Sequence, residues 1–243
     1  MNIVSKLAKR NADAFENAPV LIACLGDSVT HGCFEVWLDR FGHIDGRCDQ
    51  EDGYVSGIRR RLNRLYPTAA VSVLNAGIGG DNAPGGLKRL ERDVLRFSPD
   101  LVTVNFGLND AMSGMEGLGK YRDAMDGIFA RLIDGGIESM LVTPNRMCSY
   151  VSSHIAYDRL REIAAEAAKI QNDGVLDAYV QTAREVAARR GVPVADAYRV
   201  WCSMDKNGVD TTAMLCNDIN HPTPEAHGIF VEAIIQQMLE GGN

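Results

Sequence analysis

The segment VLIACLGDSVTHG, residues 20–32, begins with six consecutive apolar residues and then becomes small and polar. A continuous apolar run of this length that ends at a glycine is typical of a strand buried on both faces, as in a parallel sheet. Ser28 follows that strand, two residues past Gly26. In open α/β sheets the loops at the carboxyl ends of the strands form the ligand crevice. The segment therefore predicts a parallel sheet and places a serine hydroxyl where ligands bind.

Four further runs of this kind recur along the chain, separated by longer segments with helical spacing. The five predicted strands are 20–25, 71–74, 101–106, 139–142 and 192–195. The predicted helices are 55–65, 87–96, 121–133, 154–170, 175–190 and 224–239, the last capped by Thr223 with Pro224 in its first turn. This alternation predicts an α/β protein built around a parallel sheet. Because no repeat, low-complexity tract or linker interrupts it, one domain over residues 1–243 is expected.

Composition and charge exclude several classes of protein. The 243 residues are 46% hydrophobic and 23% charged, which excludes a disordered or fibrous chain. The formal net charge of −7 disfavours nucleic acid and anionic membrane surfaces as partners. No apolar run approaches the ~18 residues of a membrane span. Acidic residues separate the N-terminal basic residues from the run at 18–25, so a signal peptide is not expected either.

The six cysteines have no spacing that indicates a metal site or a disulfide framework. They are Cys24, Cys33, Cys48, Cys148, Cys202 and Cys216. No Cys-x-x-Cys pair and no zinc-type Cys/His spacing is present, so six free thiols and no metal site are expected. A chain of this size can build its own core, and scattered thiols favour a reducing compartment. The expected location is therefore the cytoplasm.

Residues suited to catalysis follow the first two predicted strands. Ser28 lies within Gly26-Asp27-Ser28, and its alternative role is a turn or a helix cap. The segment NAGIGGDN, residues 75–82, follows the second strand, and its glycines allow main-chain N–H groups to approach an anion. Its spacing is not that of a dinucleotide-binding turn, because Asn82 stands where the third glycine is required.

Two more segments complete the set. Asn109 follows the third strand, and its side-chain amide can donate to a developing negative charge, although asparagine is also common in turns. Asp218 precedes His221 by three residues, and a carboxylate at that spacing can accept from one ring nitrogen and leave the other free as a base. A metal-ligand pair and a surface turn are the alternatives for these two residues. Together the four segments supply a nucleophile, oxyanion donors and an oriented base, as acyl transfer requires.

In these four segments the chain resembles the GDSL/SGNH hydrolase family. The matching blocks are residues 26–28, 75–81, 107–110 and 218–221, and the resemblance spans about residues 20–239. It implies a flavodoxin-like, three-layer α/β/α fold and a serine ester hydrolase. Val29 departs from the leucine in the family's name.

The resemblance also implies a role for each matching residue. Transferred by position, Ser28 is the nucleophile, His221 the base and Asp218 its orienter. The oxyanion hole is formed by the main-chain N–H groups of Ser28 and Gly80 and by the Asn109 amide, with Gly79 as the alternative to Gly80. The implied mechanism has two steps, through an acyl-enzyme, and uses no cofactor or metal.

The substrate is less constrained, because the family architecture serves lipases, lysophospholipases, thioesterases, arylesterases and carbohydrate deacetylases. The acidic segment 39–52 and the absence of an exposed apolar lid favour a short acyl group, above all acetyl, on a polar alcohol such as a sugar. A lysophospholipase or thioesterase is the alternative. Trp37, Tyr54 and Trp201 are candidate stacking platforms for a sugar, or ordinary packing residues.

Two alternatives come from other classes of protein. One is a non-catalytic module that binds an anion at the glycine turn 77–80. The other is a metal-dependent phosphoesterase that uses Asp27, Asn109, Asp110 and His221. The irregular segment 33–53 is either part of the ligand crevice or a surface loop.

The remaining candidates are assigned more modest roles. Four histidines, His31, His43, His154 and His227, are expected to be structural, since one base suffices. Arg146 is expected either to contact a substrate oxygen or to face solvent.

Overall fold

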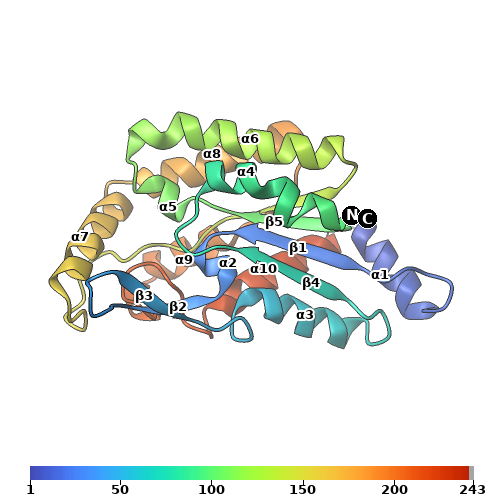
Figure 1. Ribbon diagram of the computed structural model, residues 1–243, viewed down its shortest axis with the longest axis horizontal. Helices are drawn as coiled ribbons and strands as arrows, with labels where there is room; N and C mark the ends of the chain where they lie inside the picture. Colours follow the sequence, from blue (N-terminus) through green and yellow to red (C-terminus); the bar gives the residue numbers. More distant parts are fainter. Residues whose placement is uncertain (241–243) are drawn as a thin grey trace.

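Five parallel strands form the main sheet of the computed structural model, which describes residues 1–240 (Figure 1). The strands are β1 (Leu21–Gly26), β4 (Ser72–Gly77), β5 (Leu101–Asn105), β6 (Glu138–Val142) and β7 (Val194–Ala195), in the spatial order β4-β1-β5-β6-β7. Each overlaps one of the predicted apolar runs. The prediction of a five-stranded parallel sheet is therefore confirmed.

Helices cover both faces of this sheet and give the fold its three layers (Figure 1). On one face lie α4 (Ala83–Asp93), α6 (Leu118–Asp134) and α8 (Val175–Arg190), and on the other lie α1 (Asn2–Ala12), α3 (Tyr54–Leu65) and α10 (His227–Glu240). Next to these, α7 (Asp158–Asn172) packs against α8, and α9 (Ala197–Lys206) packs against α10. Ile22, Leu25 and Val104 are fully buried, which explains why the strands read as unbroken apolar runs. None of the described helices combines the length and apolar character needed to cross a membrane.

The helices at the two ends of the chain differ from those expected. Helix α1 was not predicted, and it buries only Ile3 and Leu7 from an otherwise polar segment. Helix α10 begins at His227, because the preceding residues form a turn in which the Ala226 N–H donates to Thr223 Oγ1 over 3.3 Å. Thr223 is therefore not the cap of the helix, which starts three residues past the predicted position.

The segment 33–53 is not irregular, because it contains an antiparallel hairpin of β2 (Cys33–Leu38) and β3 (Ile44–Cys48). The hairpin aligns Cys33 with Cys48, whose Cα atoms are 3.9 Å apart, and the two form a disulfide bond. The prediction of free thiols is wrong for these two cysteines and right for the other four. A pairing across a hairpin depends on register, which spacing alone does not reveal. The cytoplasmic location loses part of its support and stays a prediction.

The strand order positions the segments that carry the candidate catalytic residues. The order is that of flavodoxin-like sheets, in which the winding reverses between the first and third strands, here β1 and β5, and ligands bind at their carboxyl ends. Gly26 aligns with Gly77 on one side and with Asn105 on the other. Gly77 is required, because a Cβ atom there would lie 2.2 Å from the main-chain nitrogen of His31. The segments after β1, β4 and β5 therefore converge.

The buried guanidinium of Arg89, on α4, ties these strand ends together. Its Nη2 donates to the Gly26 carbonyl over 2.8 Å, and its Nη1 donates to the Ala76 carbonyl over 2.6 Å. Its Nε donates to Asp81 over 2.6 Å, and Asp93 accepts from Nη1 over 3.2 Å. The Arg89 side chain is only 8% exposed, so these charge-assisted bonds are shielded from water.

We expect Arg89→Ala to lower the free energy of unfolding by about 3 kcal/mol or more, because it removes the buried donor to the Gly26 and Ala76 carbonyls and leaves the Asp81 carboxylate without its counter-ion. Urea denaturation followed by circular dichroism measures the change. The matched control is Arg92→Ala on the same helix, whose exposed guanidinium bonds only to Asp93 and whose loss should change stability little. Equal losses in the two variants would contradict the role assigned to Arg89.

Candidate active site

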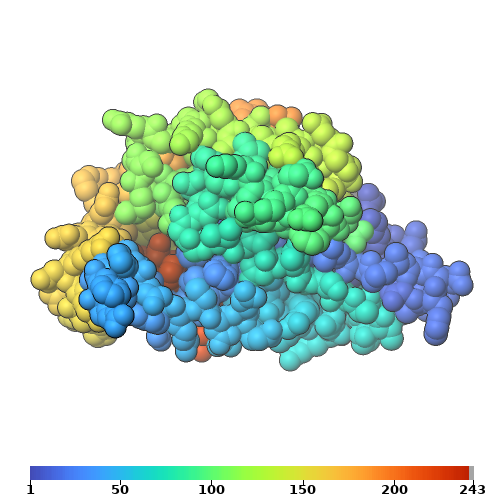
Figure 2. All heavy atoms as spheres, viewed as in Figure 1, coloured from blue at the N-terminus to red at the C-terminus, as the bar shows by residue number. Residues whose placement is uncertain are grey.

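A pocket of about 550 Å³ opens at the carboxyl ends of β1, β4 and β5. Figure 2 shows the hollow, with red spheres of the C-terminal part of the chain between the hairpin in blue and the segments in green. The pocket brings together every predicted catalytic and oxyanion residue except Asp218, namely Ser28, Gly79, Gly80, Asn109 and His221. These residues come from four separate segments of the chain, so the predicted convergence at this edge of the sheet is confirmed.

Ser28 and His221 are in direct contact at the floor of the pocket. The distance from Ser28 Oγ to His221 Nε2 is 2.9 Å, a hydrogen bond of normal length. Ser28 begins the short helix α2 (Ser28–His31), and the Asp27 side chain caps that helix by accepting from the Val29 N–H over 3.0 Å. Both reacting side chains are more than nine-tenths buried. The arrangement is that of a nucleophile paired with its general base.

The second ring nitrogen of His221 does not contact Asp218. Its Nδ1 lies 3.1 Å from the main-chain carbonyl oxygen of Phe34, in β2. Within residues 1–240 no hydrogen bond joins Asp218 to His221; the side chain found near its carboxylate is His154, whose Nδ1 is 4.0 Å away. The predicted orienting contact is therefore absent from this structure. Phe34 was missed because a main-chain acceptor leaves no signature in the sequence.

The donors expected for an oxyanion line the same pocket. Asn109 stands in α5 (Leu108–Ala111), directly after β5, and one of its side-chain N–H groups donates to the Asp81 carbonyl over 2.8 Å. This bond fixes the amide and leaves its other N–H free, since an amide nitrogen carries two hydrogens. Gly80 adopts a φ of +75°, which glycine tolerates best, and a Cβ atom there would meet nothing within 4 Å. Its N–H makes no hydrogen bond within residues 1–240.

The two aspartates offered as metal ligands are engaged in other contacts. Asp27 accepts from Val29, and Asp110 accepts from the Ala83 N–H over 3.0 Å. Burial raises the pKa of Asp27 to about 7 and that of Asp110 to about 6, which favours neutral carboxyls over metal ligands.

Elsewhere in the described chain, the side chains spaced for a metal are His31, Cys33 and Cys48. The two sulfurs are bonded to each other, so neither is a free thiolate ligand. The geometry of the described residues therefore gives the phosphoesterase alternative no ligand set.

The other candidate residues lie partly in the core and partly at the surface. Tyr54 and Trp201 are fully buried and serve as core residues, whereas Trp37 is 36% exposed and lines a smaller cavity beside the pocket. Arg146 pairs with Asp205 over 3.3 Å, so it meets neither of its expected roles. His227 accepts from the Tyr54 N–H over 3.1 Å, as expected of a structural histidine.

His31 lines the pocket next to the disulfide, a position that its structural assignment did not anticipate. The hairpin itself was also missed. Apolar and aromatic residues in 33–38, followed by a glycine at position 42, are the sequence signal that could have indicated it.

Comparisons with known proteins agree with this geometry. The family model for the GDSL-like lipase/acylhydrolase family matches residues 24–229. A curated relative, the uncharacterized lipoprotein YqeF of Bacillus subtilis, is 27% identical over 180 residues, which are 68% of this chain and 72% of that protein. An acetylxylan esterase of Geobacillus stearothermophilus is 36% identical over 58 residues, 24% of this chain and 26% of that protein.

The fold is also similar to solved structures. A crystal structure of an acetylxylan esterase from Geobacillus stearothermophilus superposes with a TM-score of 0.65 at 20% identity, covering 90% of this chain and 94% of that one. The three-layer fold and the family match together define the class of protein as an ester hydrolase. The chain belongs to the GDSL-like lipase/acylhydrolase family, and it is a carboxylic ester hydrolase.

We expect Asn109→Ala to lower kcat for ester hydrolysis on the order of 100-fold, because it removes one oxyanion donor, with a smaller change in KM. Initial rates on p-nitrophenyl acetate measure both constants. Asn63→Ala, which truncates an exposed asparagine on α3, is the control and should keep wild-type rates. A wild-type kcat in Asn109→Ala would contradict the proposed donor.

The pH dependence of kcat/KM reports on His221. Burial lowers the pKa of this histidine to about 4, so the ring is neutral, and able to accept the serine proton, above that pH. We expect kcat/KM to fall only as pH drops toward about 4, rather than at the ordinary histidine value near 6.5. Rates at fixed ionic strength from pH 4 to 8, with circular dichroism at each pH to confirm folding, measure the profile. A fall centred at 6.5 or above would contradict the effect of burial.

Proposed function

We propose that the protein is a serine ester hydrolase that forms an acyl-enzyme on Ser28 and removes short acyl groups, above all acetyl, from a polar alcohol such as a carbohydrate. The observation that carries the proposal is the 2.9 Å contact between Ser28 Oγ and His221 Nε2 inside a pocket. A module that only binds an anion has no need of a nucleophile paired with a base.

In the acylation step, His221 Nε2 takes the proton of Ser28 Oγ as this oxygen bonds to the ester carbonyl carbon. The carbonyl electron pair moves onto its oxygen, where the N–H groups of Ser28 and Gly80 and the amide of Asn109 donate to the negative charge. The intermediate collapses, the bond to the alcohol oxygen breaks, and the departing oxygen takes the proton from Nε2. Ser28 is left acylated.

In the deacylation step, water replaces the alcohol. His221 Nε2 accepts a proton from the water as its oxygen attacks the acyl carbon, and the same donors hold the second oxyanion. Collapse breaks the bond to Ser28 Oγ, which regains its proton, and the free carboxylic acid leaves. The balance of atoms needs no cofactor.

Polar side chains around the pocket and the names of two relatives support the acetyl substrate. Glu35, Asp45 and Asn220 line the pocket and can bond to hydroxyl groups of an alcohol. Both the partial sequence match and the superposed structure are named acetylxylan esterases. These features favour a sugar ester over a lipid.

A second candidate, an esterase or thioesterase for longer acyl groups, is favoured by the apolar part of the same pocket. Val36, Ile44, Leu160 and Ile163 form one side of a volume much larger than an acetyl group. At the hairpin tip, Phe41 is 69% exposed. An exposed apolar tip suits a longer acyl chain.

The experiment that separates these candidates is hydrolysis of p-nitrophenyl esters from acetate to laurate, with EDTA present, by wild type and Ser28→Ala. We expect turnover by the wild type that peaks at acetate, and none by Ser28→Ala, because the variant lacks the nucleophile. Acetylated xylo-oligosaccharides are tested next. Serine-dependent turnover that peaks at long chains would favour the second candidate.

Two other outcomes would contradict the proposal itself. Full activity in Ser28→Ala would eliminate the acyl-enzyme mechanism. Loss of wild-type activity on addition of EDTA would revive metal-assisted hydrolysis.

A further inference from the structure

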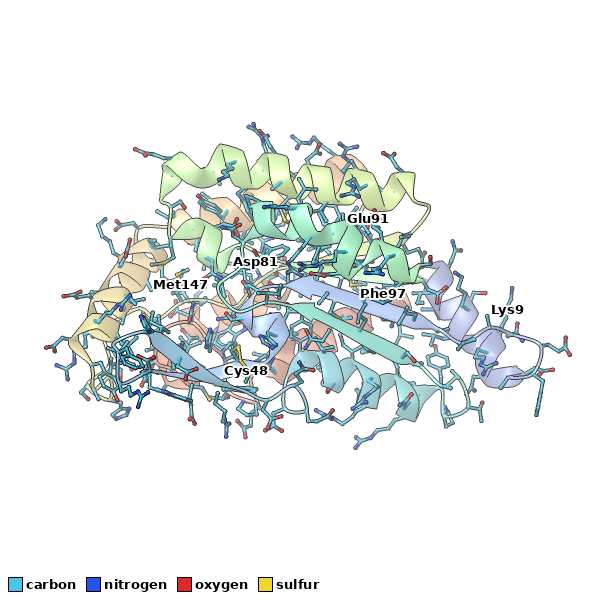
Figure 3. All side chains as sticks on the ribbon, in the orientation of Figure 1. Lys9, Cys48, Asp81, Glu91, Phe97 and Met147 are labelled. Atoms are coloured by element: carbon cyan, nitrogen blue, oxygen red, sulfur yellow. A yellow bond between two sulfur atoms is a disulfide. The ribbon has the colours of Figure 1, made fainter. Side chains whose placement is uncertain are left out.

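The β2–β3 hairpin holds the Phe34 carbonyl against the proposed catalytic histidine. Figure 3 labels Cys48, and its yellow disulfide bond lies beside α2, which begins at Ser28. Phe34 directly follows Cys33, and its side chain is fully buried, 5.1 Å from the ring of His227 between centroids. Both its ring and the adjacent disulfide restrict movement of its carbonyl.

An irregularity in the hairpin changes the pairing of Phe34. The register runs from Cys33 opposite Cys48 to Val36 opposite Gly46, so Phe34 and Glu35 together oppose a single residue of β3. This is the arrangement of a β-bulge, which disrupts the ladder locally and re-aims main-chain groups, often beside active sites. Here the Phe34 carbonyl accepts from His221 Nδ1 over 3.1 Å in a buried contact.

The loop that carries Asp218 is held with the carboxylate away from His221. The Asn217 side-chain oxygen accepts from the main-chain N–H groups of Asn220 and His221, each over 2.9 Å. The Cys216 N–H donates to the His221 carbonyl over 2.7 Å, which closes the loop. Within it Asp218 has a φ of +55°, and its side chain is 21% exposed. These bonds hold the main chain of the loop, and among the described residues no hydrogen bond joins the Asp218 carboxylate to the His221 ring.

We infer that the Phe34 carbonyl, carried on the disulfide-closed hairpin, is the positioning group that orients His221 and holds its proton on Nδ1, in place of Asp218. The inference rests on the proposed serine mechanism and specifies how its base is prepared. With Nδ1 as the donor to Phe34, the lone pair of Nε2 faces Ser28 Oγ. During acylation the serine proton passes to Nε2, and the Nδ1 proton stays where it is.

The decisive variant is Asp218→Asn, which keeps the shape of the side chain and removes its charge. We expect kcat on p-nitrophenyl acetate to fall by less than about tenfold. Where an aspartate does orient the histidine of a triad, the same change favours the wrong tautomer and costs on the order of 10⁴ in kcat. A loss of tenfold or more in Asp218→Asn would overturn the inference.

A measurement without substrate tests the tautomer directly. In protein labelled with ¹⁵N histidine, the nitrogen shifts of His221, assigned by comparison with His221→Gln, report which ring nitrogen carries the proton. We expect a protonated Nδ1 and an unprotonated Nε2 at neutral pH in wild type and in Asp218→Asn alike. A proton on Nε2, or an averaged tautomer, in either protein would overturn the inference. Because no ester is involved, this outcome is distinct from failure of the serine mechanism, which Ser28→Ala reports.

The contribution of the hairpin is tested by the double variant Cys33→Ser/Cys48→Ser. We expect kcat to fall about tenfold or more, with a smaller change in KM, because a loosened carbonyl orients the base less well. Cys202→Ser, which alters a half-buried free thiol, is the control and should keep the wild-type kcat. A wild-type kcat in the double variant would overturn the role of the hairpin. Asp218→Asn leaves the disulfide intact, so it decides the inference even where the double variant does not fold.

Discussion

The convergence of two strand ends, those of β1 and β4, on one buried guanidinium is the constraint on which the site depends. The Arg89 guanidinium donates hydrogen bonds and accepts none. It donates to the carbonyls of Gly26 in β1 and Ala76 in β4, and to the carboxylate of Asp81. Asp81 in turn supplies the carbonyl that fixes the Asn109 amide. The positions of the nucleophile's turn and of the oxyanion donors are therefore coupled through one side chain that lies beneath them. Separating the buried Arg89 charge from its partners costs free energy, because water does not replace the lost hydrogen bonds. The turns that contain these partners are therefore held rigidly.

Beside the buried Arg89, the β2–β3 hairpin shapes the pocket. It forms one wall of the pocket, exposes apolar side chains at its tip and presents the Phe34 carbonyl to His221. The hairpin after β1 thus contributes both to the wall of the pocket and to the contact that His221 Nδ1 makes. A carbonyl is a neutral acceptor, so it orients the ring without the charge that a carboxylate would add. Burial without a counter-charge lowers the pKa of His221, and the ring stays neutral and ready to accept a proton.

The pocket combines two chemistries that belong to different ester substrates. The polar side chains that line it suit the hydroxyl groups of a sugar ester, and the apolar side chains that line it suit a long acyl chain. The acetylxylan esterase of Geobacillus stearothermophilus is similar to this chain in its fold, at 20% identity. The hairpin and α7 supply most of the apolar side chains of the pocket, so its fit to an acyl chain depends on them.

The sequence by itself determined the sheet, the family and most of the site. The apolar runs that end in glycine predict buried parallel strands, and Ser28, Gly80, Asn109 and His221 lie together because parallel strands end at one edge of a sheet. These inferences hold because each strand and each motif is recognised from a short local pattern, and a parallel sheet brings the ends of its strands to one edge. Only the tertiary structure decided the Cys33–Cys48 bond and the acceptor that His221 meets. The first depends on hairpin register and the second on a main-chain atom, which every residue type provides, so neither leaves a trace in the order of the amino acids.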